Sequence, residues 1–148
     1  MYKRILVAVD GTEQSYKALA HAVAIAETFD SELKIVTVVP HLHYYNGMND
    51  NVHNENIVFD IQDKLRPFYK NVLTNAVIKV RSDNPDVNFS TIMSEGRPSV
   101  KIVELAEKEG YDLIIMGGRR ISGILSLLEE RTSRSVLDNS KIPVMIIT

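Results

Sequence analysis

The fold is decided by the stretch ILVAVDGT at residues 5–12, in which a continuous apolar run ends at Asp10 and Gly11. Five consecutive apolar residues without polar alternation are typical of a strand that is buried on both faces of a parallel sheet. Asp-Gly is a turn signal. The next apolar residues follow the i, i+3, i+4, i+7 spacing of a helix, at Tyr16, Leu19, Ala20 and Val23. The segment therefore predicts a strand, a turn and a helix.

The same alternation of strand-like and helix-like segments continues to the end of the chain. Apolar runs predict further strands at residues 33–39, 87–93, 113–116 and 143–147. Helices are expected at 55–81, with a kink or local break at Pro67, then from Pro98 with Gly110 as a cap, and between the last two strands. The Asn- and His-rich residues 41–54 are expected to form a loop.

Strands that are separated by helices imply right-handed crossovers and a parallel sheet with helices on both faces. We therefore predict a doubly wound α/β fold in one domain over residues 1–148, with five parallel strands in the order 3-2-1-4-5. Such sheets bind ligands at the carboxyl ends of the strands, where the strand order reverses. The reversal falls between the first and fourth strands, so Asp10 and Gly117 should flank one crevice.

The composition excludes several classes of function. Hydrophobic residues make up 45% of the chain and charged residues 24%, and 17 basic against 19 acidic residues give a net charge of -2. This balance argues against a protein that grips nucleic-acid backbones. The absence of cysteine excludes disulfides and thiolate chemistry. No apolar run reaches the roughly 20 residues that span a bilayer, and the amino terminus lacks a signal-peptide pattern. A cytoplasmic protein without membrane or nucleic-acid partners is expected.

Three segments resemble the landmarks of one known family. They are ILVAVDGTE at residues 5–13, DLIIMG at 112–117 and PVMII at 143–147, in that order along the chain. With these segments the sequence is similar to the universal stress protein (UspA-like) domain. The resemblance implies an adenine nucleotide alpha hydrolase-like fold and a non-enzymatic role in stress response. It also implies a homodimer in which the C-terminal strands of two chains pair, and an apolar edge strand invites such pairing.

The family contains members that bind ATP and members that do not, and a glycine motif after the fourth strand distinguishes them. The motif reads G-x-x-G, nine residues, then G-S or G-T. Gly117 matches its first glycine, but Arg120 stands at the second, and Glu130 and Arg131 stand at the final pair. Glycines in a phosphate loop let backbone N–H groups approach the phosphate oxygens. The departures therefore predict weak or absent ATP binding.

Glu130 places a carboxylate near the start of the last helix, where the anionic phosphates of a ligand would lie. One hypothesis is that this carboxylate takes the place of the phosphate and pairs with Arg119, Arg120 or Arg131. The alternative is that these residues belong to a solvated helix face of mixed charge, where exposed ion pairs are common. The sequence leaves both interpretations open.

The nucleoside end of the family's site is better matched. The candidate binding residues are Asp10, Val39, Met116, Gly117, Arg119 and Ser133. The resemblance implies that the Asp10 carboxylate bonds the ribose or base region, that Val39 and Met116 pack near adenine, and that the Ser133 hydroxyl meets phosphate. Capping of the turn, ordinary core packing and a solvent-facing hydroxyl explain the same residues without a ligand. A genuine ATP- or AMP-binding protein is therefore the alternative function, with Mg²⁺ needed only for ATP.

No catalytic or metal-binding constellation is evident in the sequence. His41, His43 and His53 lie in a polar loop whose one acidic residue is Asp50, so incidental histidines are favoured over a metal site. No nucleophile or general base has a recognisable oriented partner. A slow ATPase, or a hydrolase of a small phosphorylated metabolite, is accordingly the least supported of the functions considered.

Overall fold

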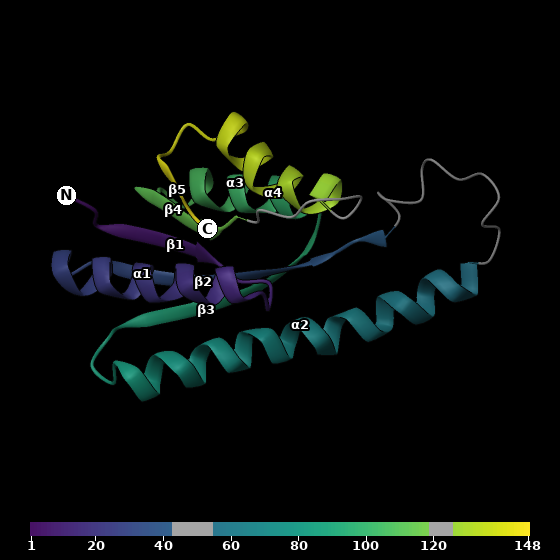
Figure 1. The fold of residues 1–148 in the computed structure, drawn as a ribbon, viewed down its shortest axis with the longest axis horizontal. Coiled ribbons are helices and arrows are strands. Elements are labelled where there is room, and N and C mark those ends of the chain that lie inside the picture. Colours follow the sequence, from purple (N-terminus) through teal and green to yellow (C-terminus); the bar gives the residue numbers. More distant parts are fainter. Residues whose placement is uncertain (43–54, 119–125) are drawn as a thin grey trace.

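Figure 1 shows a twisted sheet with helices packed against both of its faces. This computed structural model describes residues 1–42, 55–118 and 126–148, without the side chains of 55–58 and 126–131. The elements along the chain are β1 (Arg4–Ala8), α1 (Glu13–Phe29), β2 (Glu32–Pro40), α2 (Glu55–Asp83), β3 (Phe89–Gly96), α3 (Pro98–Lys108), β4 (Leu113–Gly117), α4 (Ser126–Asn139) and β5 (Val144–Ile147).

All five strands are parallel and follow the predicted order, β3-β2-β1-β4-β5. β1 lies in the middle, where Ala8 is level with Val36 of β2 and with Met116 of β4. The chain moves outward from β1 through β2 to β3, and then crosses back to β4 and β5. The strand order therefore reverses between β1 and β4, which confirms the predicted fold class.

The sheet separates two hydrophobic cores. Successive side chains of a strand point to opposite faces, so Ile5 and Val7 of β1 pack with α1 and α2, whereas Leu6 packs with α3 and α4. All three side chains are fully buried, and burial on both faces explains why the strand is continuously apolar. The crossovers from β1 to β2 and from β2 to β3 run the same way along the sheet, so α1 and α2 lie on one face. The two later crossovers run the opposite way, so α3 and α4 lie on the other face, as Figure 1 shows.

β3 differs from its predicted range. It runs from Phe89 to Gly96 rather than over 87–93, because its ladder with β2 continues as far as the pair formed by Pro40 and Gly96. β3 is an edge strand and is only partly buried, so polar residues such as Ser94 and Glu95 can occupy it. Their polarity concealed the carboxyl end of this strand in the sequence.

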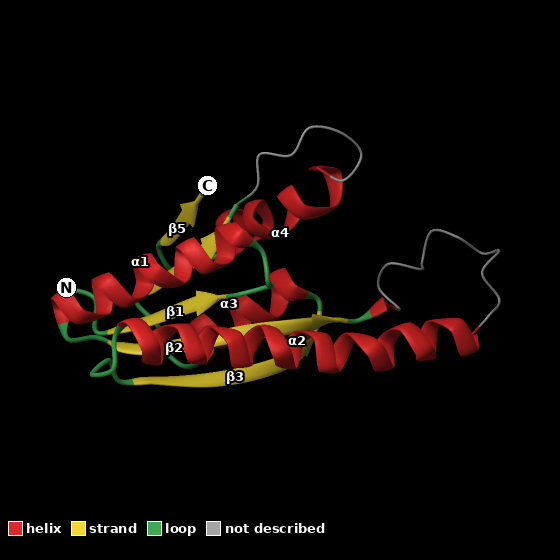
Figure 2. Cartoon of the chain, turned by 60° about the horizontal axis from the view of Figure 1, so that its bottom comes forward, coloured by secondary structure: helices red, strands yellow, loops and turns green. Residues whose placement is uncertain are grey.

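α2 continues through Pro67, so the local break considered at that residue is absent. Proline lacks the N–H that would bond to the carbonyl of Asp63, but both residues are exposed and water can hydrate that carbonyl. The helix extends past the carboxyl ends of β1 and β2 (Figure 2). Although α2 has 29 residues, no helix in the described part of the chain is both long and apolar enough to cross a bilayer.

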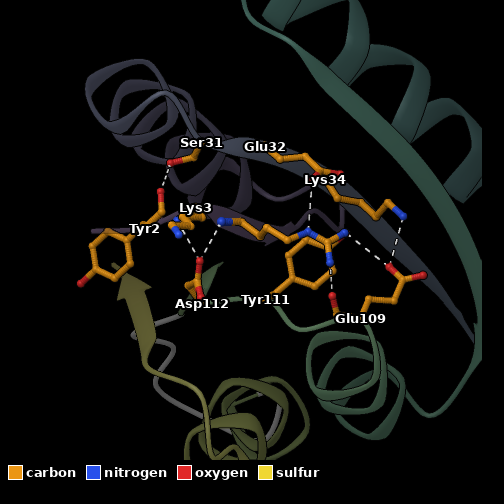
Figure 3. Close-up of polar contacts among 9 residues, drawn as sticks. Tyr2, Lys3, Ser31, Glu32, Lys34, Glu109, Tyr111 and Asp112 are labelled. Atoms are coloured by element: carbon orange, nitrogen blue, oxygen red, sulfur yellow. Dashed lines mark hydrogen bonds and ion pairs between the residues drawn. The ribbon is translucent and has the colours of Figure 1, made fainter.

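A polar network holds the amino-terminal end of the sheet together (Figure 3). Asp112 Oδ2 accepts hydrogen bonds from the backbone amides of Lys3 and Arg4, at 2.7 and 2.9 Å. The Arg4 side chain donates to Glu32 Oε2 at 3.1 Å, and its guanidinium carbon lies 4.6 Å from the centroid of the Tyr111 ring. These contacts tie together the beginnings of β1, β2 and β4 at the end of the sheet opposite to the strand-order reversal.

Candidate functional site

A cleft of about 560 Å³ lies at the carboxyl ends of the strands, where the strand order reverses. Ala8, Asp10 and Thr12 approach it from β1 and the following turn, and Met116 and Gly117 approach it from the end of β4. A volume of this size is ordinary for a small-molecule site. The predicted crevice between Asp10 and Gly117 is therefore present in the structure.

The turn between β1 and α1 is ordered by its own side chains. Asp10 Oδ1 accepts hydrogen bonds from the backbone nitrogen of Thr12 at 3.0 Å and from its hydroxyl at 2.6 Å. Thr12 caps α1, because its Oγ1 accepts a hydrogen bond from the Ser15 amide at 3.1 Å. Ser15 Oγ in turn donates to the Thr12 carbonyl at 2.8 Å. The first turn of α1 is thus held in place at the edge of the cleft.

Asp10 orders the turn, as one of its two interpretations predicts, and its exposed side chain also lines the cleft, which leaves the ligand-binding role a prediction. Its second carboxylate oxygen, Oδ2, has no hydrogen-bond partner among the described residues. A carboxylate oxygen accepts hydrogen bonds and cannot donate them when ionised. This atom is therefore suited to a hydroxyl or amino group of a ligand.

Gly117 allows α1 to pack directly against the end of β4. A Cβ atom at this position would lie 2.7 Å from the Gln14 carbonyl carbon and 2.7 Å from the Ser15 backbone nitrogen, which is closer than real Cβ contacts. At Gly118 a Cβ would overlap the Ile146 side chain, and the Gly118 amide donates to the Ile147 carbonyl at 2.8 Å. Packing against backbone therefore requires glycine at position 117, whereas at position 118 the Ile146 side chain would have to shift.

The side walls of the cleft are mostly apolar and come from both faces of the sheet. Residues of α2, α3 and the carboxyl end of β2 form them: Leu65, Tyr69, Pro98, Ile102, Val38, Pro40 and Leu42. Thr132 and Ser133 of α4 add hydroxyl groups. Among the lining residues that the structure describes, Asp10 carries the one formal charge. The described lining suits an uncharged group with a few polar atoms.

The structure brings four of the six candidate residues together. Asp10, Met116, Gly117 and Ser133 all line the cleft. Val39 is buried and is absent from the lining, where its neighbour Val38 is found instead. The two side chains point to opposite faces of the sheet, so they occupy different surroundings.

Several predictions made from the sequence fall outside the described residues. Arg119 and Arg120 lie in the undescribed stretch after β4, and the side chains of Glu130 and Arg131 are not described. The proposed replacement of phosphate by Glu130 therefore stays a hypothesis. His43 and His53 also lie outside the described residues.

Sequence reasoning missed the contribution of α2 to the cleft. Leu65 and Tyr69 are four residues apart on one face of the helix, and together they form part of the wall. Their spacing marks them as a pair that shares a helix face. The sequence does not show that α2 extends past the carboxyl ends of the strands, so it gave no indication that these two side chains reach the cleft.

Comparisons with known proteins agree with this architecture. The sequence model of the universal stress protein family matches residues 1–148. The chain is 31% identical to the universal stress protein MJ0531 of Methanocaldococcus jannaschii, over 99% of the chain and 82% of that protein. It is 30% identical to the universal stress protein YxiE of Bacillus subtilis, over 99% of both proteins.

Solved structures show the same fold. The universal stress protein UspA from Lactobacillus plantarum superposes with a TM-score of 0.79 at 22% sequence identity. The alignment covers 99% of this chain and 98% of that one. At this level of identity, the match supports the arrangement of strands and helices and leaves the ligand to be inferred from the cleft.

Proposed function

Since the chain belongs to the universal stress protein family, we propose that it is a non-enzymatic stress-response protein whose cleft binds an adenine nucleotide, with AMP-like ligands favoured over ATP. The observation that carries this proposal is the convergence of Asp10, Met116, Gly117 and Ser133 on one cleft at the strand-order reversal. The cytoplasmic location expected from the sequence is part of the same proposal.

The chemistry of the cleft suits a nucleoside. Apolar side chains such as Leu65, Ile102 and Met116 offer contacts to the faces of a purine ring. Asp10 Oδ2 is available to accept hydrogen bonds from ribose hydroxyls. Ser133 Oγ would lie 3.9 Å from a Cβ atom at position 118, so a hydroxyl donor and the backbone after β4 lie close together. The Ser133 hydroxyl is our candidate for the phosphate end, since the Gly118 amide already donates to the Ile147 carbonyl.

Two solved neighbours support a ligand with a single phosphate. One is a universal stress protein in complex with cAMP, and the other is the universal stress protein from Archaeoglobus fulgidus in complex with dAMP. They are 22% and 20% identical to this chain, with TM-scores of 0.72 and 0.67. Both ligands combine adenine with one phosphate group.

A triphosphate is expected to bind less well. Arg120, Glu130 and Arg131 replace glycine and hydroxyl residues of the ATP-binding motif. These substitutions remove positions at which a backbone N–H could approach phosphate, and Glu130 adds a like charge. In the extreme case the cleft binds no nucleotide, and the protein then acts through protein partners alone.

Thermal unfolding with AMP, ATP–Mg²⁺ or GMP tests this proposal. A ligand at 100 times its Kd should stabilise the protein by about 2.7 kcal/mol, and we expect this increase with AMP at concentrations where ATP and GMP have smaller effects. Absence of a shift with all three at millimolar concentration would contradict nucleotide binding. A larger shift with ATP than with AMP would show that the altered glycine motif still holds phosphates.

We also propose that two chains associate through β5. This strand is at the edge of the sheet, and Val144, Met145, Ile146 and Ile147 are all partly exposed. An apolar edge strand presents unpaired backbone groups to another chain. Sedimentation equilibrium at micromolar concentration should give twice the chain mass of 16.7 kDa. A single species of monomer mass would contradict the homodimer.

A further inference from the structure

Gln62 of α2 is a buried polar side chain, 6% exposed, whose amide makes three hydrogen bonds near the cleft. Its Oε1 accepts from the Leu42 amide at 3.1 Å, and its Nε2 donates to the Pro40 carbonyl at 3.0 Å. The same nitrogen donates to Glu95 Oε1 at 3.0 Å. Because Leu42 offers a donor and Pro40 an acceptor, one orientation of the amide satisfies all three partners.

Glu95 is itself held by Arg66, one turn further along α2. Arg66 donates from Nε to Glu95 Oε2 at 3.1 Å and from a terminal nitrogen to Oε1 at 3.0 Å. Such a two-point contact fixes the plane of the carboxylate more tightly than a single bond does. Asp63 accepts a further bond from the same guanidinium at 3.2 Å. Arg66 thus orients Glu95, and Glu95 orients the amide of Gln62.

The backbone that Gln62 contacts forms part of the cleft wall. Pro40 is the last residue of β2, and both Pro40 and Leu42 line the cleft. The ladder between β2 and β3 ends at the pair of Pro40 and Gly96, and the His41 amide adds one bond to the Gly96 carbonyl at 3.2 Å. Beyond that point, Gln62 fixes the Leu42 amide from the side of α2.

We infer that Gln62 is a positioning residue for the cleft: with Glu95 and Arg66, it holds the wall formed by Pro40 and Leu42 against α2 and so sets the width available to a ligand. The effect on the wall is independent of what the cleft binds. The effect on ligand affinity rests on the proposed function.

Amide hydrogen exchange in the ligand-free protein tests the effect on the wall. Gln62→Met keeps the side-chain volume but removes all three hydrogen bonds, and we expect the Leu42 amide to exchange about tenfold faster, as the loss of one hydrogen bond predicts. Gln62→Glu should have at least this effect, because its carboxylate would face both the Pro40 carbonyl and Glu95 without a donor. Unchanged exchange at Leu42 in both variants would overturn the inference.

Arg66→Gln is a second variant, and the Arg66 side chain that it replaces is about half exposed. It should raise Leu42 exchange in the same direction by a smaller factor. Lys64→Gln removes the same charge from an exposed position of the same helix, which forms no hydrogen bond or ion pair with the described residues. If Gln62→Met fails to fold, equal exchange at Leu42 in Arg66→Gln and Lys64→Gln overturns the inference.

Titration with AMP tests the effect on the ligand. The Kd of Gln62→Met should rise about tenfold, the equivalent of about 1.4 kcal/mol, while that of Lys64→Gln should match the wild-type value. Failure of the wild-type protein to bind AMP would contradict the proposed function, and Leu42 exchange then decides the positioning role alone. If Leu42 exchanges faster in Gln62→Met but the variant binds AMP as tightly as wild type, the wall does not control binding. That result would overturn the part of the inference that concerns ligand affinity.

Discussion

Gly117 lies directly against the backbone of Ser15, so that a side chain of even one carbon at position 117 would meet that backbone nitrogen at 2.7 Å. Gly117→Ala should therefore lower the free energy of unfolding by about 1–3 kcal/mol, because α1 would have to move away from β4. Urea unfolding at neutral pH measures this loss.

Gly110 provides the matched control. It has a φ of +69° and open space around its missing Cβ, and it follows the end of α3. Asparagine tolerates this left-handed conformation better than other residues with side chains. Gly110→Asn should therefore lower the free energy of unfolding by less than Gly117→Ala does. If Gly117→Ala were the more stable of the two, close packing of α1 on β4 would not be what requires glycine at position 117.

Asp10→Asn should separate the two roles of this residue. Asparagine keeps an oxygen that can accept from Thr12, so we expect the free energy of unfolding to stay within about 0.5 kcal/mol of wild type. The loss of the ionised oxygen that faces the cleft should raise the Kd for AMP about tenfold. Isothermal titration with AMP and urea unfolding of the same sample measure both quantities.

The comparison for that substitution is Asp10→Ala, which removes both oxygens and should weaken ligand binding and destabilise the turn together. If Asp10→Asn destabilises the protein as much as Asp10→Ala while AMP affinity is unchanged, the carboxylate serves the turn alone.

Tyr111→Phe should reveal how much the hydroxyl contributes to the amino-terminal end of the sheet. The Tyr111 hydroxyl donates to Glu109 Oε2 at 3.3 Å, whereas its ring lies under the Arg4 guanidinium. We expect the free energy of unfolding to fall by about 0.5–1.5 kcal/mol, which is typical of the loss of one hydrogen bond. Tyr111→Leu should cost more, because it also removes the cation–π contact. Equal losses in the two variants would mean that the ring contact with Arg4 contributes little to stability.

The pH dependence of stability should report on Glu95. Its hydrogen bond to Arg66 lowers the pKa of the Glu95 carboxyl below the ordinary 4.5, although partial burial opposes this. A lowered folded-state pKa means that the unfolded chain binds the proton first. The stabilisation is therefore complete above the unfolded pKa and is lost as the pH falls through the folded one.

The excess stability of wild type over Glu95→Gln should accordingly be constant near neutral pH and should shrink as the pH falls below 4.5. Urea unfolding of both proteins across that range gives the difference directly. Asp60→Asn is a suitable control, because Asp60 is exposed on α2, the helix that carries Arg66, and no hydrogen bond or ion pair joins it to the described residues. A difference that grows toward acid pH would contradict the ion pair with Arg66.

The strand order and the place of the cleft could be predicted because burial on both faces leaves a clear pattern in the sequence. Residues 5–9 and 113–116 are continuously apolar, and each run is followed at once by glycine or Asp-Gly. The right-handed crossover rule then sets the face on which each helix lies, and a doubly wound sheet in the order 3-2-1-4-5 places the first and fourth strands side by side. Asp10 and Gly117 were found by this argument, since they mark the ends of two adjacent central strands, whereas Met116 was assigned by the resemblance to the family.

Details that depend on side-chain direction and on long-range distance could not be predicted. Val38 and Val39 are identical residues in a run buried on both faces, so the sequence does not say which of them points toward the cleft. The polar end of β3 resembles a loop until its pairing with β2 is known. The position of Gln62 depends on how far α2 extends past the sheet, and no local pattern encodes that distance.

The sheet divides the interior into two cores that have no buried side chain in common in the described part of the chain, one with α1 and α2 and the other with α3 and α4. The cleft touches both layers, through Leu65 and Tyr69 on one side and Ile102 and Ser133 on the other. A molecule held there resists the separation of either layer from the sheet. Occupancy should therefore make the two halves open and close together as one cooperative unit, so that amide protection rises in both cores at once.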